Sequence, residues 1–378
     1  MRLTLLVLIT LFLCGGCAGK LKPTKALSYP PEMIDGTVLF GAPVAAAPAV
    51  DLLRVSPQME AFVDEHIMDS HFGYGRFRRL MKKMVGSGLF INQYDKDATY
   101  TAAQTFALRK GNCLAYTNLF VALARQAGLN ASYQLIDAQP TWDVASGLLV
   151  RNNHVNVRLQ RMQVPGFTKN ELTVDFNNVQ AAPGMRRVAI SDAYAESMFY
   201  GNLAVDQIQA GNGRAAFAFL KRGIVTEPAN TDLWNNLGAL YSMNGQYELA
   251  QSAYEIVMKI SKNDRTAVSG LAKSLHRQGK FDEAKAYERL SVKYRRRNPF
   301  YHYAVAELAF QNNAFEEAMV AVNRAIKLER GNARFYALRA ATAQELGDVA
   351  LARRSTKLQR KHGAADPVTM VAGALEFD

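Results

Sequence analysis

The chain has 378 residues, of which 49% are hydrophobic and 21% are charged, and its formal net charge is +12. This composition excludes a disordered chain, a collagen-like chain and a disulfide-rich miniprotein, and the length suffices for two or three domains of roughly 100–200 residues each. The three cysteines fall into two classes, because Cys14 and Cys17 end the first apolar segment whereas Cys113 stands alone.

The N-terminus has the pattern of a secretory signal. Arg2 precedes an apolar run over 3–13, which is too short to span a membrane, and small residues follow it up to Cys17. This ending resembles a bacterial lipoprotein signal, although Cys14 stands where leucine is commoner. The resemblance implies that residues 1–16 are removed and that Cys17 carries a lipid; an ordinary signal cleavage nearby is the alternative.

The residues after Cys17 indicate a location and a connecting segment. No aspartate follows Cys17, a pattern similar to that of outer-membrane lipoproteins, so the expected location is the bacterial cell envelope, at the periplasmic face of the outer membrane. Residues 17–55 contain several prolines among alanines and predict a tether with an irregular lead-in. Helical patterns followed by strand patterns over 56–196 predict an α+β domain.

A helix is expected to begin immediately after Asn112, with Cys113 in its first turn. Asn112 is a favourable N-cap, apolar residues follow at helical spacing, and Gly128 can end the helix. Unpaired backbone N–H groups and the helix dipole at this place favour a thiolate over a thiol. A nucleophilic cysteine needs this environment.

Two later segments alternate polar and apolar residues, as half-buried strands do. Residues 154–159 begin this alternation with the polar His154, and residues 172–176 place Asp175 in the same way. Both side chains are therefore expected on the polar face of a strand, where neighbouring strands could align them. With Cys113 they make a candidate set of nucleophile, base and orienting carboxylate.

These segments resemble the transglutaminase-like fold, a branch of the papain-like cysteine enzymes. The resemblance covers roughly 95–180 and rests on residues 109–116, 123–129, 153–157 and 173–176. It implies that Cys113 is the nucleophile, His154 the general base and Asp175 the residue that fixes the imidazole. It also implies an α+β transglutaminase-like (papain-like) domain that acts on amide bonds of a protein or peptide, as a cysteine protease or deamidase or as a transamidase.

The sequence offers more than one candidate for the groups that would donate hydrogen bonds to a tetrahedral oxyanion. The backbone N–H of Cys113 is the first candidate, and the side chain of Gln104 or of Gln93 is a candidate for the second donor. A solvated glutamine is the alternative at each position. Trp142 either walls an acyl groove or packs in the core.

Metal and cofactor chemistry is not expected. His66 and His71 lie five residues apart on one predicted helix and have no third ligand at suitable spacing. The sequence contains neither a phosphate-binding loop nor a zinc cluster. Solvated or packed histidines are the expected outcome.

Residues 197–366 repeat with a period of 34. A small residue recurs at one fixed place in each unit: Ala204, Gly238, Ala272, Ala306 and Ala340. A residue suited to a turn recurs at a second fixed place: Gly211, Gly245, Gly279, Asn313 and Gly347. The repeat resembles the tetratricopeptide repeat, most strongly at 234–241, and a tail over 367–378 follows it. The resemblance implies an all-α solenoid of five units that binds a protein partner.

The repeats also carry most of the positive charge. Over 197–366 there are 25 Lys and Arg residues against 16 Asp and Glu residues. An exported lipoprotein rarely meets nucleic acid, so anionic lipid headgroups, anionic polysaccharide or an acidic protein partner is favoured, with solvated helix faces as the alternative.

The sequence thus supports two hypotheses. In the first, the chain is a membrane-anchored thiol hydrolase or transamidase whose repeats recruit a substrate or partner. In the second, it is a non-catalytic envelope scaffold that binds proteins through its repeats. The presence of all three candidate residues, Cys113, His154 and Asp175, favours the first.

Overall fold

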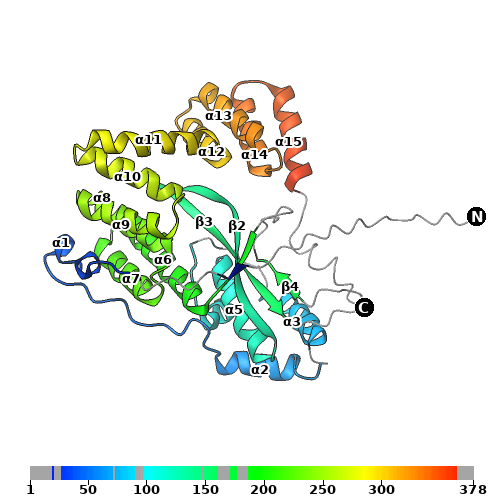
Figure 1. The fold of residues 1–378 in the computed structure, drawn as a ribbon. Helices are drawn as coiled ribbons and strands as arrows, with labels where there is room; N and C mark the ends of the chain where they lie inside the picture. The colour runs from blue at the N-terminus through cyan, green and yellow to red at the C-terminus, as the bar shows by residue number, and fades with distance from the viewer. Residues whose placement is uncertain are drawn as a thin grey trace, which may run out of the picture.

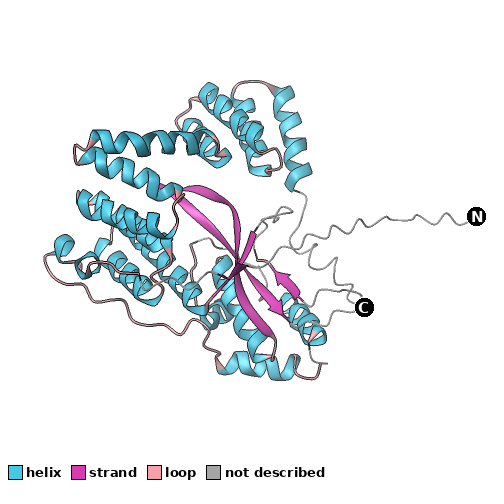
Figure 2. Ribbon diagram, in the orientation of Figure 1, coloured by secondary structure: helices cyan, strands magenta, loops and turns pink. Residues whose placement is uncertain are grey.

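The structure is a computed structural model that describes residues 19–20, 27–70, 73–89, 95, 97–145, 148–160, 171–176 and 186–363. For residues 19–20, 136–145, 148–154, 186 and 363 it describes the backbone alone. A helical and sheet-containing region comes first and a long helical array follows (Figures 1 and 2). The predicted signal, with Cys14 and Cys17, and the C-terminal tail lie outside the described residues.

Four helices and a sheet form the N-terminal domain. The helices are α2 (Pro57–His66), α3 (Tyr74–Gly86), α4 (Ala102–Leu108) and α5 (Cys113–Gln126). Helix α5 lies at the centre, and its residues 114–124 are all buried. A single apolar core surrounds it, built from α2, α3, α5 and one face of the sheet. The predicted α+β class is confirmed.

The sheet contains five described strands in the order β1-β5-β2-β3-β4. They are β1 (Gly19–Lys20), β2 (Asn130–Ala145), β3 (Leu148–Gln160), β4 (Glu171–Val174) and β5 (Arg186–Ile190). Strands β2 and β3 form a long antiparallel hairpin with an irregularity between Ile136 and Thr141. The hairpin extends beyond the domain, so that β2 lies beside a helix of the C-terminal array, α12 (Figure 1).

Ten helices make up the array over 192–363, and they pair in succession as five helical hairpins. Their bounds are α6 (Asp192–Gln209), α7 (Gly213–Thr226), α8 (Thr231–Met243), α9 (Tyr247–Ile260), α10 (Arg265–Arg277), α11 (Phe281–Arg296), α12 (Pro299–Gln311), α13 (Phe315–Leu328), α14 (Ala333–Glu345) and α15 (Val349–Gly363). Each hairpin turns at a residue with positive φ, as the period predicts, and Asn313 with φ of 58° replaces glycine in the fourth.

The array and the N-terminal domain share one core at their junction. Helix α6 begins at Asp192, and its residues Ala195, Phe199 and Tyr200 belong to the core around α5. The expected domain boundary between 196 and 197 therefore falls inside a helix. The first hairpin of the array is packed into the domain that precedes it.

The lead-in also packs on the array. It includes η1 (Pro31–Ile34) and α1 (Thr37–Phe40), and residues 27–50 run along α7 and α8 (Figure 1). The Tyr29 ring lies 4.8 Å from the Trp234 ring, and the carbonyls of Val44 and Ala47 accept hydrogen bonds from Lys221 and Arg222. We therefore correct the expectation of a tether over 17–55: its described part is irregular but bound.

The apolar core of the array is interrupted between its third hairpin (α10–α11) and its fourth hairpin (α12–α13). One cluster extends from the lead-in to Leu271 on α10, and another begins at Phe300 on α12. Leu290 on α11 and Val305 on α12 remain exposed near this division. Among the described residues, no helix is both long and apolar enough to cross a membrane.

Candidate functional site

Cys113 is the first residue of α5, as the sequence predicts. The side chain of Asn112 caps the helix, because its Oδ1 accepts from the backbone N–H of Ala115 at 3.0 Å. Its Nδ2 donates to the Thr99 hydroxyl at 2.7 Å. Gly111 is required just before the cap, since a Cβ there would lie 2.6 Å from the Cβ of Ala115. The turn that carries Cys113 is therefore tightly packed.

The thiol of Cys113 is not a thiolate in this environment. Burial raises the pKa of Cys113 to about 11, while the backbone N–H of Leu114 lowers the pKa, the Asp175 carboxylate raises it and the N–H of Cys113 lowers it. The helix start acts in the expected direction, but loss of solvation outweighs it. A base is therefore required to ionise the thiol at neutral pH.

Asp175 follows directly after β4 and lies close enough to Cys113 for its charge to act on the thiol. The next residue, Phe176, anchors this turn to α5, because its ring is stacked at 6.2 Å on Tyr116 and lies 5.7 Å from Phe120. The structure thus brings Cys113 and Asp175 together from separate segments of the chain.

His154 is a backbone position in β3, where it pairs with Ile136 of β2. Its side chain lies outside the described part of the structure, as does the side chain of Trp142. Position 154 is two residues before Asn156, whose Nδ2 donates to Asp175 Oδ2 at 3.4 Å. The three predicted residues therefore come from α5, β3 and the end of β4.

Gln104 has a structural role in α4. It is the third residue of a capping box, in which its Oε1 accepts from the N–H of Thr101 at 3.0 Å and its own N–H donates to the Thr101 hydroxyl at 3.3 Å. No described contact joins Gln104 to Cys113, and a role for its side-chain N–H as an oxyanion donor stays a prediction. Gln93 lies outside the described residues.

His66 packs at the end of α2, where its ring lies 5.3 Å from the ring of Phe62. His71 lies outside the described residues. Within the described part of the chain, no group of three His, Cys, Asp or Glu side chains could hold a metal ion.

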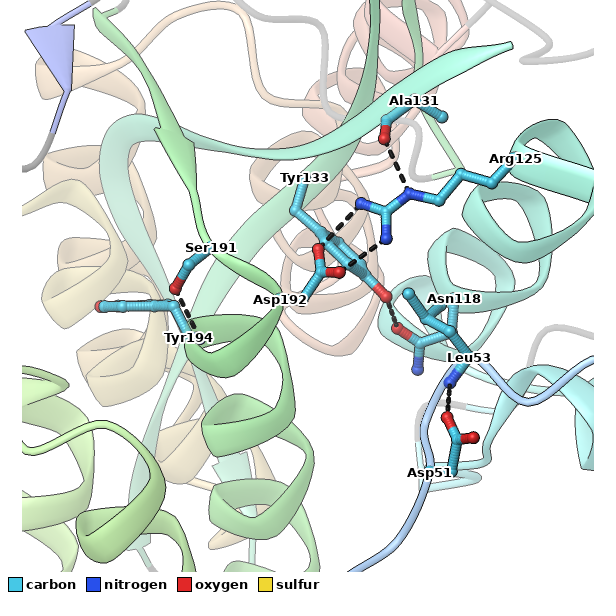
Figure 3. Close-up of polar contacts among 9 residues, drawn as sticks. All are labelled: Asp51, Leu53, Asn118, Arg125, Ala131, Tyr133, Ser191, Asp192 and Tyr194. Carbon is cyan, nitrogen blue, oxygen red and sulfur yellow. Dashed lines mark hydrogen bonds and ion pairs between the residues drawn. The ribbon is translucent and has the colours of Figure 1, made fainter. Parts of the chain in front are cut away.

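The far end of α5 is clamped to the array (Figure 3). The Arg125 guanidinium donates to both carboxylate oxygens of Asp192 at 2.6 and 2.8 Å and to the carbonyl of Ala131 at 3.0 Å. The hydrogen bonds that Arg125 donates to the Asp192 carboxylate raise the pKa of Arg125. Tyr133 of β2 donates to Asn118 in the middle of α5 at 2.8 Å. These bonds fix the helix that carries Cys113 against the sheet and against α6.

Sequence analysis missed two residues beside the candidate site. Asn156 and Gln134 are buried polar side chains on neighbouring strands. The alternation over 154–159 assigns Asn156 to a polar face, but that face is buried at this position. An amide between two buried valines was the signal that could have drawn attention to it.

A second feature is a groove on the array, with a volume of about 700 Å³. Helices α12 and α13 line it with apolar and charged side chains, among them His302, Val305, Val320, Arg324 and Lys327.

Comparisons with known proteins agree with the two parts of the chain. The model of the transglutaminase-like superfamily matches residues 69–158, which include Cys113 and His154 but end before Asp175. The tetratricopeptide repeat model matches residues 219–252. No match was found among curated proteins.

Solved structures match the helical array at low identity. MamA 41-end from Desulfovibrio magneticus RS-1 is 15% identical, with a TM-score of 0.27, over 47% of this chain and 98% of that one. Pseudomonas aeruginosa PilF is 16% identical, with a TM-score of 0.26, over 48% and 84%. YrrB, described as a tetratricopeptide protein with an unusual peptide-binding site, is 13% identical, with a TM-score of 0.26, over 47% and 92%. Such scores carry no argument about this chain.

The superfamily match over the α5–β3 region agrees with an α+β domain whose central helix begins at a cysteine. The repeat match agrees with the paired helices that follow. The chain therefore contains a transglutaminase-like domain joined to an all-α tetratricopeptide-repeat solenoid.

Proposed function

We propose that the N-terminal domain is a cysteine hydrolase or transamidase that acts on amide bonds of a protein or peptide. The observation that carries this proposal is the meeting of Cys113 and Asp175 at the start of α5, with His154 on the strand between them in sequence. Helix position does not ionise the thiol, so the reaction depends on His154 as base.

The proposed reaction has two steps. His154 takes the thiol proton of Cys113, and the sulfur attacks the amide carbonyl to form a tetrahedral oxyanion beside the N–H groups of Cys113 and Leu114. The imidazolium then gives its proton to the leaving amine, or to ammonia, and a thioester forms. In the second step water, activated by His154, releases the acid, or a second amine takes the acyl group. Asp175 holds the imidazole in orientation throughout.

An acyl-trapping experiment tests this proposal. Incubation with p-nitrophenyl acetate is expected to add one acetyl group to Cys113, and the adduct is expected to disappear in water with release of acetate. Mass spectrometry of the intact chain measures both, with Cys113→Ser as control. Addition of hydroxylamine diverts the acetyl group to an amine and so measures the transfer reaction. A Cys113 that never acylates would contradict the proposal.

The second hypothesis, a scaffold without catalysis, is favoured by one observation. Loss of solvation raises the pKa of the Cys113 thiol, which is also the behaviour of a structural cysteine. The same acyl-trapping experiment separates the two hypotheses, because a scaffold has no need of a thiol that acylates and turns over.

We further propose that the repeats bind a protein partner. Tetratricopeptide repeats generally mediate such contacts, and the groove between α12 and α13 offers both an apolar floor and charged side chains. A partner bound there brings substrate to the same chain that carries Cys113. Nucleic acid is not among the proposed partners.

We also propose that a lipid on Cys17 anchors the chain at the periplasmic face of the outer membrane. The support is the sequence pattern around Cys17. Cys17→Ser is expected to move the chain from the membrane fraction to the soluble fraction, because the diacylglyceryl chains supply the membrane affinity. Fractionation followed by immunoblotting measures this, with Cys14→Ser as a matched control that stays in the membrane. A Cys17→Ser chain that also stays there would exclude the anchor.

A further inference from the structure

Three polar side chains form a row across the sheet beside the candidate site. Gln134 of β2 pairs directly with Asn156 of β3. The antiparallel register of β3 and β4 pairs Val157 with Val174, and its continuation by one residue places Asn156 opposite Asp175. The hydrogen bond from Asn156 Nδ2 to Asp175 Oδ2, at 3.4 Å, agrees with this placement. The charge of Asp175, at one end of the row, acts on the Cys113 thiol.

Both amides in the row are buried at a cost. Asn156 is fully buried and Gln134 is 4% exposed. Neither Asn156 Oδ1 nor Gln134 Oε1 has a hydrogen-bond partner within the described part of the chain. A buried acceptor without a partner costs free energy that an apolar side chain would not lose, although an apolar side chain at 156 would also remove the hydrogen bond to Asp175. Stability alone therefore does not explain an asparagine at 156.

We infer that Asn156 is a positioning residue for the candidate site: its amide holds the Asp175 carboxylate where that carboxylate can orient the His154 imidazole toward Cys113. The inference rests on the proposed function. Asn156 acts through Asp175 and does not touch the reacting atoms. Its hydrogen bond is accepted by the half-buried Asp175 carboxylate and joins that carboxylate to the neighbouring strand. Gln134 lies in the same row but one strand further from Asp175, so it lacks this role.

The test compares Asn156→Leu with Gln134→Leu. Each variant removes one unpartnered buried acceptor, and Asn156→Leu also removes the hydrogen bond to Asp175, so the first readout is thermal unfolding, which shows that both variants fold. The second readout is the pH dependence of Cys113 alkylation by iodoacetamide. In Asn156→Leu the rate at pH 7 is expected to fall about tenfold to a hundredfold, because a displaced catalytic group loses activity on this scale. In Gln134→Leu the pH profile is expected to remain that of the wild type.

Asn156→Gln provides the conservative comparison, because it retains an amide donor on a longer side chain. It is expected to recover part of the lost rate, and it serves as the second variant if Asn156→Leu does not fold. A wild-type profile in Asn156→Leu would overturn the positioning role and leave the proposed function intact. Equal losses in Asn156→Leu and Gln134→Leu would overturn it too, since buried polarity in general would then be responsible. A wild-type profile that does not depend on His154 would overturn both proposals.

Discussion

Replacing His154 by alanine is expected to move the midpoint of Cys113 alkylation by iodoacetamide up to a pH of about 11, the pKa that burial gives this thiol. A thiol with such a pKa is about one ten-thousandth thiolate at pH 7. In the wild type, His154 is expected to accept the thiol proton, so that the midpoint lies near the pKa of an imidazole, roughly 6.5. The rate at pH 7 is therefore expected to fall about a hundredfold or more in the variant, allowing for the higher nucleophilicity of a more basic thiolate.

Asp175→Asn serves as a control, because its direct effect on the alkylation rate is expected to be opposite to that of His154→Ala. The Asp175 charge raises the pKa of Cys113, so its removal alone lowers that pKa and speeds alkylation at neutral pH. This direct effect is expected in the His154→Ala background, where no imidazole remains to be oriented. In the wild-type background the loss of orientation is expected to dominate and slow the reaction. A faster reaction in both backgrounds would show that Asp175 acts on Cys113 by charge alone.

Trp234→Ala is expected to lower the free energy of unfolding by about 3–5 kcal/mol, the scale for removing a fully buried tryptophan. Trp234 is fully buried on α8, and its Nε1 donates to the carbonyl of Pro228 at 2.9 Å. Its ring meets that of Tyr29 edge to face, so the variant is also expected to loosen the lead-in. Urea denaturation measures the first effect, and the rate of cleavage by chymotrypsin after Phe40 measures the second.

Two variants separate the contributions of Trp234. Trp234→Phe keeps an aromatic ring against Tyr29 but removes the N–H donor, and is expected to cost much less than alanine. Tyr29→Ala removes the ring contact alone and is expected to accelerate cleavage at Phe40 with a small change in stability. If Trp234→Ala left the cleavage rate unchanged, the lead-in would be held by its other contacts, such as those of Lys221 and Arg222 with its carbonyls.

Elements specified by local chemistry were predictable from the sequence. Helix α5 begins where Asn112 caps it, and Gly128 follows its end with φ of 77°. The hairpin turns of the array follow from residues that tolerate a left-handed backbone, including Asn313. In each case one or two neighbouring residues determine the conformation, so the pattern alone contains the information.

The features that depend on distant parts of the chain were not predictable. The lead-in is bound by scattered apolar side chains and by its own backbone carbonyls, and such acceptors leave no trace in an apolar pattern. The pKa of Cys113 depends on what covers the thiol and not on the helix start alone. In the sequence, Asn156 is one of several polar residues that alternate with apolar ones along a strand. Only the tertiary structure reveals that it is buried and hydrogen-bonded to Asp175.

Because the lead-in is bound to the solenoid, it limits how far the folded domains of an anchored chain can lie from the membrane. With a lipid on Cys17, as proposed, nine residues lie between the anchor and Leu27, which already packs on the core of the array. Fully extended, ten residues span at most about 36 Å. The first helical hairpin, which shares its core with the α5 domain, would therefore remain within about one domain diameter of the bilayer. Such a chain reaches substrates at the membrane surface and leaves those deeper in the surrounding compartment to other proteins.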